Sequence, residues 1–313
     1  MASRRRRTGK KQLVGLIIFL TLCLVISIGE LTGSETLPTW GDLFGEAGLA
    51  EAPAEVTGDG LAVRVLDVGQ GLSVLVQTGE QNVLIDGAER SEAASIVSYL
   101  EGCGVKKLDL VIATHPHSDH IGGLADILEE IPADRIIMPK LPSELVPTSS
   151  VYQNLLKAVQ REKISASYAK PGQSFDLGGG AALTVLGPAG EYGDLNDWSV
   201  VSRITYGSTA FLVTGDAEKG AEQDILSSGA RVSADVLVLG HHGSSTSSCG
   251  GFLDAVGPSF AAISCGLDND YGHPHQETLD RLEERGIESL RTDLQGTLVF
   301  ESDGEQVTVQ TAK

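Results

Sequence analysis

"THPHSDHIGG", residues 114 to 123, places three of the chain's seven histidines and one aspartate within six positions. If this stretch stays extended, His115, His117 and Asp119 point the same way, because side chains alternate along extended backbone. His120 breaks that alternation. Imidazole and carboxylate groups together suit zinc, manganese or iron rather than calcium. A polar helix start with incidental histidines would not be so dense, so the pattern predicts two ligands for one metal ion and two for its neighbour.

The other four histidines also occur in pairs that follow apolar, strand-like runs. His241 and His242 come after one such run, and His273 and His275 follow another. Loops after strands present functional side chains from a rigid scaffold. Histidines of an ordinary core would be scattered, so this distribution favours one shared site.

The amino-terminal residues differ in character from the rest. Residues 13 to 29, LVGLIIFLTLCLVISIG, form an uncharged apolar run behind a basic stretch. That order is typical of a signal peptide or an uncleaved signal anchor with its basic end in the cytoplasm, whereas a buried core helix leaves the basic flank unexplained. No small-residue cleavage site follows closely, which favours an anchor. We expect a basic cytoplasmic tail at 1–12, the anchor at 13–29, a linker at 30–58 and one domain at 59–313, extracytoplasmic or secreted if the signal is cleaved.

Charge and cysteine content restrict the partners and the kinds of site. The chain has 23 basic and 42 acidic residues. Six of the basic residues lie in the tail, which leaves 17 against 42, a net charge of −25, for the rest. So acidic a domain repels nucleic acid at long range, and a polyanionic substrate would need local positive charge, which metal ions could supply. Beyond Cys23 in the apolar run, Cys103, Cys249 and Cys265 lack the spacing of a zinc site or a disulfide framework.

The pattern from residue 61 onward indicates an α/β fold. Short β-branched runs separated by glycine turns alternate with helical patterns such as 92–103 and 277–286. Runs at 296–302 and 305–311 predict a closing hairpin. Hairpins at both ends fit a purely parallel, doubly wound sheet poorly. Two packed sheets with helices outside fit better.

"THPHSDHIGG" resembles the HxHxDH signature of the metallo-β-lactamase superfamily. The rest of the chain resembles its ComEC-type branch, the extracytoplasmic metallo-hydrolase domain of bacterial competence proteins. The supporting stretches are LDVGQG (66–71), LIDGA (84–88), NDWSVV (196–201), LVTGDAEKGAE (212–222), ADVLVLGHHGSS (234–245) and YGHPH (271–275). The resemblance implies an αββα sandwich, two packed mixed sheets with helices on the outer faces and the site at one edge.

The resemblance further implies two divalent metal ions, zinc or manganese, and a ligand set. In that set His115 and His117 hold the first ion, Asp119 and His120 hold the second, Asp216 bridges both, and His241 completes the second site. Asp86 would orient a ligand from behind. Asp86 and Asp216 each end an apolar run, so turn formation is the alternative role for either.

Two departures from the family pattern concern the first ion. Many members have a further histidine between HxHxDH and the "GD", whereas no histidine lies between 120 and 241 here. Asn196 or Asp197 is the nearest substitute. The branch usually has "GQGD" near its start, and this chain has Leu72 in place of the acid.

The remaining candidates surround the ligands. His242 is as compatible with orienting a ligand as with catalysis. We expect His273 or His275 to face the metals, beside the catalytic Asp119, and to support the substrate's oxyanion or leaving group; structural loop histidines are the alternative. Ser244 is a weaker candidate for holding a phosphate.

The function expected is an extracytoplasmic, membrane-anchored hydrolase of phosphodiesters, nuclease-like, in which a metal-bridged hydroxide attacks phosphorus. DNA is a candidate substrate. The alternatives are hydrolysis of another ester (a cell-wall phosphodiester, a lactone or a small phosphorylated molecule), or a non-catalytic metal-containing module that assists DNA uptake. The ligand set disfavours β-lactam hydrolysis. One apolar run makes no pore, so we expect the hydrolase module without the transport module of full-length ComEC proteins. The sequence indicates no oligomeric state.

Overall fold

The computed structural model describes residues 60–313. The expected tail, apolar anchor and linker, residues 1–12, 13–29 and 30–58, therefore lie outside the described residues. Within the described residues, no helix has the length and apolar character needed to cross a bilayer.

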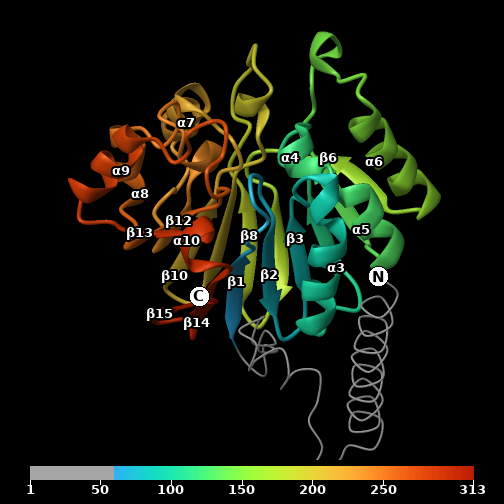
Figure 1. The fold of residues 1–313 in the computed structure, drawn as a ribbon, viewed down its shortest axis with the longest axis horizontal. Helices are drawn as coiled ribbons and strands as arrows, with labels where there is room; N and C mark the ends of the chain where they lie inside the picture. The colour runs from blue at the N-terminus through green and yellow to red at the C-terminus, as the bar shows by residue number, and fades with distance from the viewer. Residues whose placement is uncertain (1–59) are drawn as a thin grey trace, which may run out of the picture. The chain divides into compact units, whose positions relative to one another are not determined.

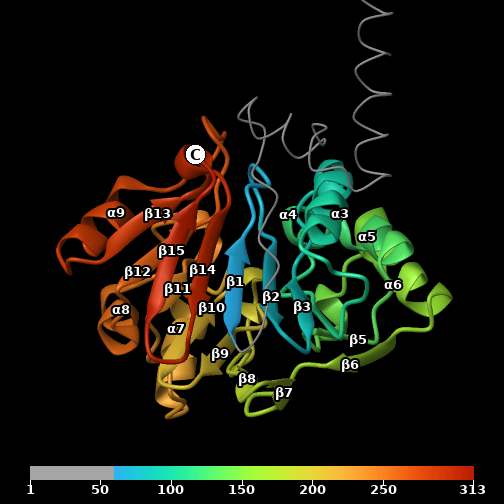
Figure 2. The same cartoon turned by 90° about the horizontal axis from the view of Figure 1, so that it is seen from below.

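The first sheet has eight strands and combines both ends of the described chain (Figures 1 and 2). Its order is β15 (Val307–Thr311), β14 (Leu298–Ser302), β1 (Leu61–Val65), β2 (Val74–Thr78), β3 (Asn82–Ile85), β4 (Leu110–Ile112), β5 (Arg135–Met138) and β6 (Ser165–Tyr168). Neighbours from β15 to β3 are antiparallel, and neighbours from β3 to β6 are parallel. The expected closing hairpin is thus confirmed as β14 and β15.

The second sheet has seven strands. Its order is β13 (Glu288–Arg291), β12 (Phe260–Ile263), β11 (Val236–Val238), β10 (Thr209–Val213), β9 (Ser202–Tyr206), β8 (Ala181–Val185) and β7 (Ser174–Gly178). Strands β10 to β13 run parallel, and β7 to β10 alternate in direction. Both sheets are therefore mixed, as expected.

Helices cover the outer face of each sheet (Figure 1). On the first sheet these are α3 (Ala93–Gly102), α4 (Ser118–Ile121), α5 (Leu124–Glu130) and α6 (Ser150–Arg161). On the second they are α7 (Lys219–Ser227), α8 (Gly250–Val256) and α9 (Gln276–Glu283), and the short α10 (Thr292–Gln295) follows β13. The α/β fold is the predicted αββα sandwich.

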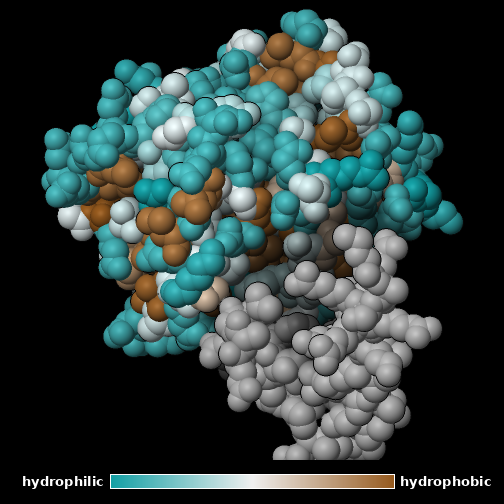
Figure 3. All heavy atoms as spheres, viewed as in Figure 1, coloured by the Kyte–Doolittle hydropathy of each residue, from teal (hydrophilic) through white to brown (hydrophobic). Residues whose placement is uncertain are grey.

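Alternation along the strands builds three apolar layers. In β4, Leu110 and Ile112 pack into the core between the sheets, while Val111 packs against the helices. A strand buried on both faces needs apolar residues at every position, which explains its unbroken apolar run. Each fully buried aliphatic side chain contributes roughly 1.5–3 kcal/mol. Outside these layers, the face drawn in Figure 3 is mainly hydrophilic, with separate apolar patches.

The parallel strands determine where function can lie. Strands β3 and β4 of the first sheet, and β10, β11 and β12 of the second, are each followed by a loop that carries an aspartate or a histidine named above. Ligands of open α/β sheets bind at such carboxyl ends. Helix α4 ends close to the backbone near Arg90: a Cβ on Gly122, the residue after this helix, would lie 2.7 Å from the Arg90 backbone nitrogen. A glycine is required there for close backbone approach.

Candidate metal centre

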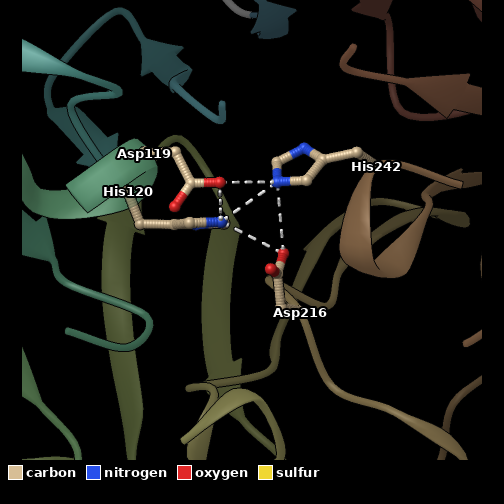
Figure 4. A group of neighbouring side chains, drawn as sticks. All are labelled: Asp119, His120, Asp216 and His242. Carbon is tan, nitrogen blue, oxygen red and sulfur yellow. Dashed lines mark hydrogen bonds and ion pairs between the residues drawn. The ribbon is translucent and has the colours of Figure 1, made fainter. Parts of the chain in front are cut away.

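Four side chains from three loops converge at this edge (Figure 4). They are Asp119 and His120 of α4, Asp216 after β10, and His242 in a 3-10 segment, Gly240–Gly243, after β11. One donor atom from each lies within 4.8 Å of the others. We call them the second group, because they include the residues expected to hold the second ion.

A first group lies beside it and consists of His115, His117 and Asp216, under the same 4.8 Å limit. Asp216 is common to both groups, the position that a bridging ligand would take. Both groups draw on loops of both sheets, since the HxHxDH residues follow β4 and Asp216 follows β10.

The donor atoms fit divalent ions better than they fit one another. His115 Nε2 lies 2.9 Å from His117 Nδ1, and His120 Nε2 lies 3.3 Å from His242 Nε2. Asp216 Oδ1 is buried and makes no hydrogen bond with any described residue, although His120 Nε2 is only 3.1 Å away. Nitrogen and carboxylate donors that converge in this way could hold a cation between them, which would offset the cost of burying them. Nitrogen and oxygen donors of this kind suit zinc or manganese.

Asp86 orients His120 from behind the second group. Its Oδ2 lies 2.7 Å from His120 Nδ1 and accepts a 2.6 Å hydrogen bond from the Thr114 hydroxyl. Its Oδ1 accepts the Thr114 backbone N–H at 2.8 Å. With Nδ1–H donating to this carboxylate, His120 presents Nε2 to the second group. Burial opposes a charge on this ring, but Asp216 and Asp86 raise the pKa of His120 well above its usual value. An ion bound there would replace the proton on Nε2, as in carboxylate–histidine–metal arrangements.

Burial and charge set the protonation states of the ligands. Burial alone would raise the pKa of Asp216, but the charges of neighbouring histidines, that of His120 first, outweigh it and hold that pKa well below the usual range. Burial, reinforced by the charge of His120, lowers the pKa of His115 far below its usual value. At neutral pH the shared carboxylate is therefore ionised, and His115 keeps a free lone pair.

The two adjacent histidines of the 3-10 segment point to different places. His241 and His242 both have left-handed backbone, with φ of 52° and 55°. His242 Nδ1 is 2.9 Å from the Ser264 carbonyl oxygen, which leaves its Nε2 in the second group. His241 Nδ1 instead lies 3.1 Å from Glu218 Oε1. The structure thus places His242 rather than His241 in the second group, because the turn rather than the spacing decides which ring faces which way. The role of His241 as a metal ligand stays a prediction.

His273 and His275 also separate. His273 is 8% exposed and lines a pocket of about 350 Å³ above the ligands. Burial, together with the neighbouring histidine charges, lowers its pKa to about 4. His275 has both ring nitrogens in the loop itself: Nδ1 accepts the Ser245 N–H at 2.9 Å, and Nε2 lies 3.2 Å from the Tyr271 carbonyl oxygen. Of the two, His273 therefore lines the pocket and His275 holds the loop together, and a catalytic role for either stays a prediction.

The other expected residues have mixed positions. Asn196 lines the pocket, and its Oδ1 is buried with no hydrogen bond to a described residue. Asp197 Oδ1 accepts the backbone N–H of Glu218 at 2.9 Å, just before α7. Leu72 is 2% exposed in the core between the sheets, so position 72 presents no side chain to the pocket. Ser244 is buried and hydrogen-bonds to Thr246 at 3.0 Å rather than facing the ligands.

Two further contributions were not signalled by the sequence. Arg281 of α9 donates to the carbonyl oxygens of Ser245, Ser247 and Ser248 at 2.8–2.9 Å and so fixes the loop that follows the histidine pair. Glu218 lies two residues after Asp216 and contacts His241. Neither role could be read from spacing, because both contacts join distant parts of the chain.

Two bacterial competence-related proteins are similar to this chain over most of its length. The chain is 34% identical over 287 residues to Competence protein ComA of Neisseria gonorrhoeae, which covers 91% of this chain and 38% of that protein. It is 33% identical over 258 residues to ComE operon protein 3 of Bacillus subtilis, which covers 76% of this chain and 32% of that protein. The chain thus spans about a third of the length of these relatives.

A solved structure and a family model define the wider group. The metallo-beta-lactamase fold protein YhfI from Bacillus subtilis superposes with a TM-score of 0.52 at 14% identity, over 77% of this chain and 100% of YhfI, which shows the fold alone. The model of the metallo-beta-lactamase superfamily matches residues 66–266, a span that contains every member of both groups. With this match, the HxHxDH ligands and the αββα sandwich, the chain belongs to the metallo-β-lactamase superfamily.

Proposed function

We propose that this chain hydrolyses phosphodiesters with two divalent ions, as a nuclease-like enzyme. The observation that carries the proposal is the buried carboxylate of Asp216, shared by two ligand groups at the base of an open pocket. Two ions bound there would supply positive charge for a phosphate and make water acidic enough to react at neutral pH. Membership of the superfamily supports hydrolysis in general. The narrower proposal, hydrolysis of phosphodiesters, rests on the positive charge that the two ions would supply.

The chain's own residues would position the substrate. Asp119 and Asp216 have lowered pKa values and are ionised at neutral pH. They would hold cations and repel anions, so a phosphate would approach from the side of the bound ions. His273 stands at the pocket wall, and its lowered pKa keeps it neutral at pH 7. A neutral imidazole can donate one hydrogen bond to charge that develops on a substrate or leaving-group oxygen.

The surroundings of the pocket favour a short or single-stranded substrate over long duplex DNA. Tyr271 lines the pocket and is 67% exposed, and its neighbours Asp268 and Asp270 are exposed acids. An acidic rim repels duplex DNA, with one charge per about 1.7 Å of its axis, more strongly than a single strand with about half that charge density. A small phosphodiester or another ester needs only the ions. The names of the relatives point to competence, which supports DNA as the substrate. We further propose that residues 13–29 anchor the domain at the outer side of a membrane.

The test uses residues 55–313, which form one compact unit, purified without chelator. We would measure its metal content and then the hydrolysis of bis-p-nitrophenyl phosphate, single-stranded DNA and duplex DNA with manganese and with zinc. Two ions per chain and metal-dependent diester cleavage are expected, with single-stranded DNA cut faster than duplex. Bound metal without cleavage of any diester would refute the phosphodiesterase proposal and favour another ester or a binding role.

A further inference from the structure

We propose that His241, oriented by Glu218, supplies the fourth protein ligand of the first group. The second group has four protein donors, whereas the first has three, His115, His117 and Asp216. The inference shares with the proposed function the premise that divalent ions bind. It goes further by moving His241, which the family resemblance places at the second ion, to the first ion, as a ligand from the loop after β11.

The two oxygens of Asp216 divide the surrounding histidines into two pairs. Oδ1 lies 3.1 Å from His120 Nε2 and 3.7 Å from His242 Nε2, which are both members of the second group. Oδ2 lies 3.7 Å from His115 Nε2 and 3.8 Å from His241 Nε2. His241 therefore faces the oxygen that belongs to the first group, at nearly the same distance as an established member of that group.

Glu218 fixes the ring of His241 in the tautomer that a ligand needs. His241 Nδ1 lies 3.1 Å from Glu218 Oε1, so Nδ1–H donates to this carboxylate and Nε2 keeps its lone pair. The same oxygen accepts hydrogen bonds from the Thr246 hydroxyl at 3.0 Å and from the Asn196 amide at 3.4 Å. A carboxylate held on two sides and bonded to the far nitrogen is the arrangement that orients metal-binding histidines. Asp86 does the same for His120 in the second group.

The backbone explains how neighbouring residues can serve two ions. Left-handed φ values at two consecutive non-glycine residues are unusual, and such conformations gather at functional sites. This turn lets His241 and His242 face different oxygens of one carboxylate. Asp197 is engaged with the backbone nitrogen of Glu218. Asn196 donates to Glu218 through its amide nitrogen, and its oxygen is the competing donor that the experiment has to test.

The experiment measures how many metal ions the full chain binds and with what affinity. The chain is purified in detergent and stripped of metal with a chelator. Zinc and manganese are titrated by calorimetry, and the bound ions are counted by elemental analysis after desalting. The variants are His241→Asn and, as a matched neighbour, His242→Asn, because asparagine tolerates left-handed backbone better than alanine. Glu218→Gln removes the orienting charge without removing the ligand, and Asn196→Ala tests the competing donor.

We expect two ions in the wild type. His241→Asn should keep one tight ion and lose about 100-fold or more in affinity for the other, and Glu218→Gln should lose about 10-fold to 100-fold for that same ion. Combining His241→Asn with His242→Asn should weaken both ions, whereas adding His117→Ala to His241→Asn should leave the tight ion unaffected. The absorption bands of a cobalt-substituted chain should also change in His241→Asn, because an imidazole ligand is lost.

Three outcomes would overturn the inference. Two ions bound by His241→Asn with wild-type affinities would refute it while leaving the proposed function intact. Loss of the first ion in Asn196→Ala but not in His241→Asn would assign the place to Asn196. A wild-type chain that binds no metal would refute both this inference and the proposed function. Far-ultraviolet circular dichroism of each metal-free variant verifies that it is folded, and Glu218→Gln provides an independent arm if His241→Asn does not fold.

Discussion

The substitution Asp86→Asn isolates the effect of one proton on a metal ligand. Asp86 bonds to His120 Nδ1 at 2.7 Å and to the Thr114 backbone N–H and hydroxyl at 2.8 and 2.6 Å. Asparagine fits the same volume and tolerates the left-handed backbone at this position, where φ is 61°. Its amide oxygen can still accept the Thr114 N–H. Its NH2 group, however, would face the Nδ1–H of His120, and two donors cannot bond.

The size of the expected effect on metal affinity follows from the tautomer that the substitution imposes on His120. To accept from the new amide, His120 must carry its proton on Nε2, the nitrogen that faces the second group. We expect the affinity for one ion to fall about 10-fold to 100-fold, as for other residues that orient metal ligands, which is about 1.4–2.7 kcal/mol. The metal-free protein loses a charge-assisted hydrogen bond worth about 1.5–3 kcal/mol. Burial raises the pKa of Asp86, which means that keeping this carboxylate charged itself costs free energy. Asparagine removes that cost, so the net loss of unfolding free energy should be smaller than the hydrogen bond alone, about 1–2 kcal/mol.

Calorimetric titration of the stripped protein measures the affinity, and urea unfolding of the metal-free protein measures the stability. The matched control is Asp235→Asn, because Asp235 Oδ2 accepts the Ala210 backbone N–H at 2.7 Å in the second sheet and an amide oxygen can do the same. The control should bind both ions normally. If Asp86→Asn also binds two ions with wild-type affinities, Asp86 does not set the tautomer of His120 and the reasoning fails.

Four further outcomes are expected. Asp119→Asn should lower turnover by about 100-fold or more, because it removes a metal ligand. The unfolding midpoint should change little, because Asp119 is only partly buried and makes no core contact. Retained turnover would exclude the two-ion mechanism. Gly122→Ala should destabilise the fold by about 1–3 kcal/mol, because its Cβ would lie 2.7 Å from the Arg90 backbone nitrogen; urea unfolding measures this. Chelation should lower the thermal midpoint by about 5–10 °C, since free metal at 100 times its dissociation constant stabilises by about 2.7 kcal/mol; an unchanged midpoint would mean no bound metal. Burial raises the pKa of Cys265 to about 12, so a thiol reagent at pH 8 should modify it only after unfolding.

The sequence predicts the parts of this molecule whose information is local. The HxHxDH spacing keeps its four side chains close together at the start of α4, where His117 is still extended and Asp119 and His120 are helical. The unbroken apolar run of β4 follows from burial on both faces. Strand β6 (Ser165–Tyr168) gives no such signal, because all four of its residues are exposed at a sheet edge. The contact between Glu218 and His241 depends on how two loops meet, and the choice between His241 and His242 depends on backbone angles. Neither is encoded in a spacing.

The ligand groups have a mechanical consequence, because each takes side chains from loops of both sheets. An ion in either group would act as a removable cross-link between segments roughly a hundred residues apart in the chain, as 115–120 are from Asp216. The sheets are otherwise joined by apolar packing in the interior and by hydrogen bonds between the loops, such as that from the Ser264 hydroxyl to the Gly71 carbonyl oxygen at 2.7 Å. Bound metal would then control how far the loops at the carboxyl ends of the two sheets can separate. Hydrogen exchange in the loops after β4 and β11 should record that opening directly, with slow exchange in the metal-loaded chain and fast exchange after chelation.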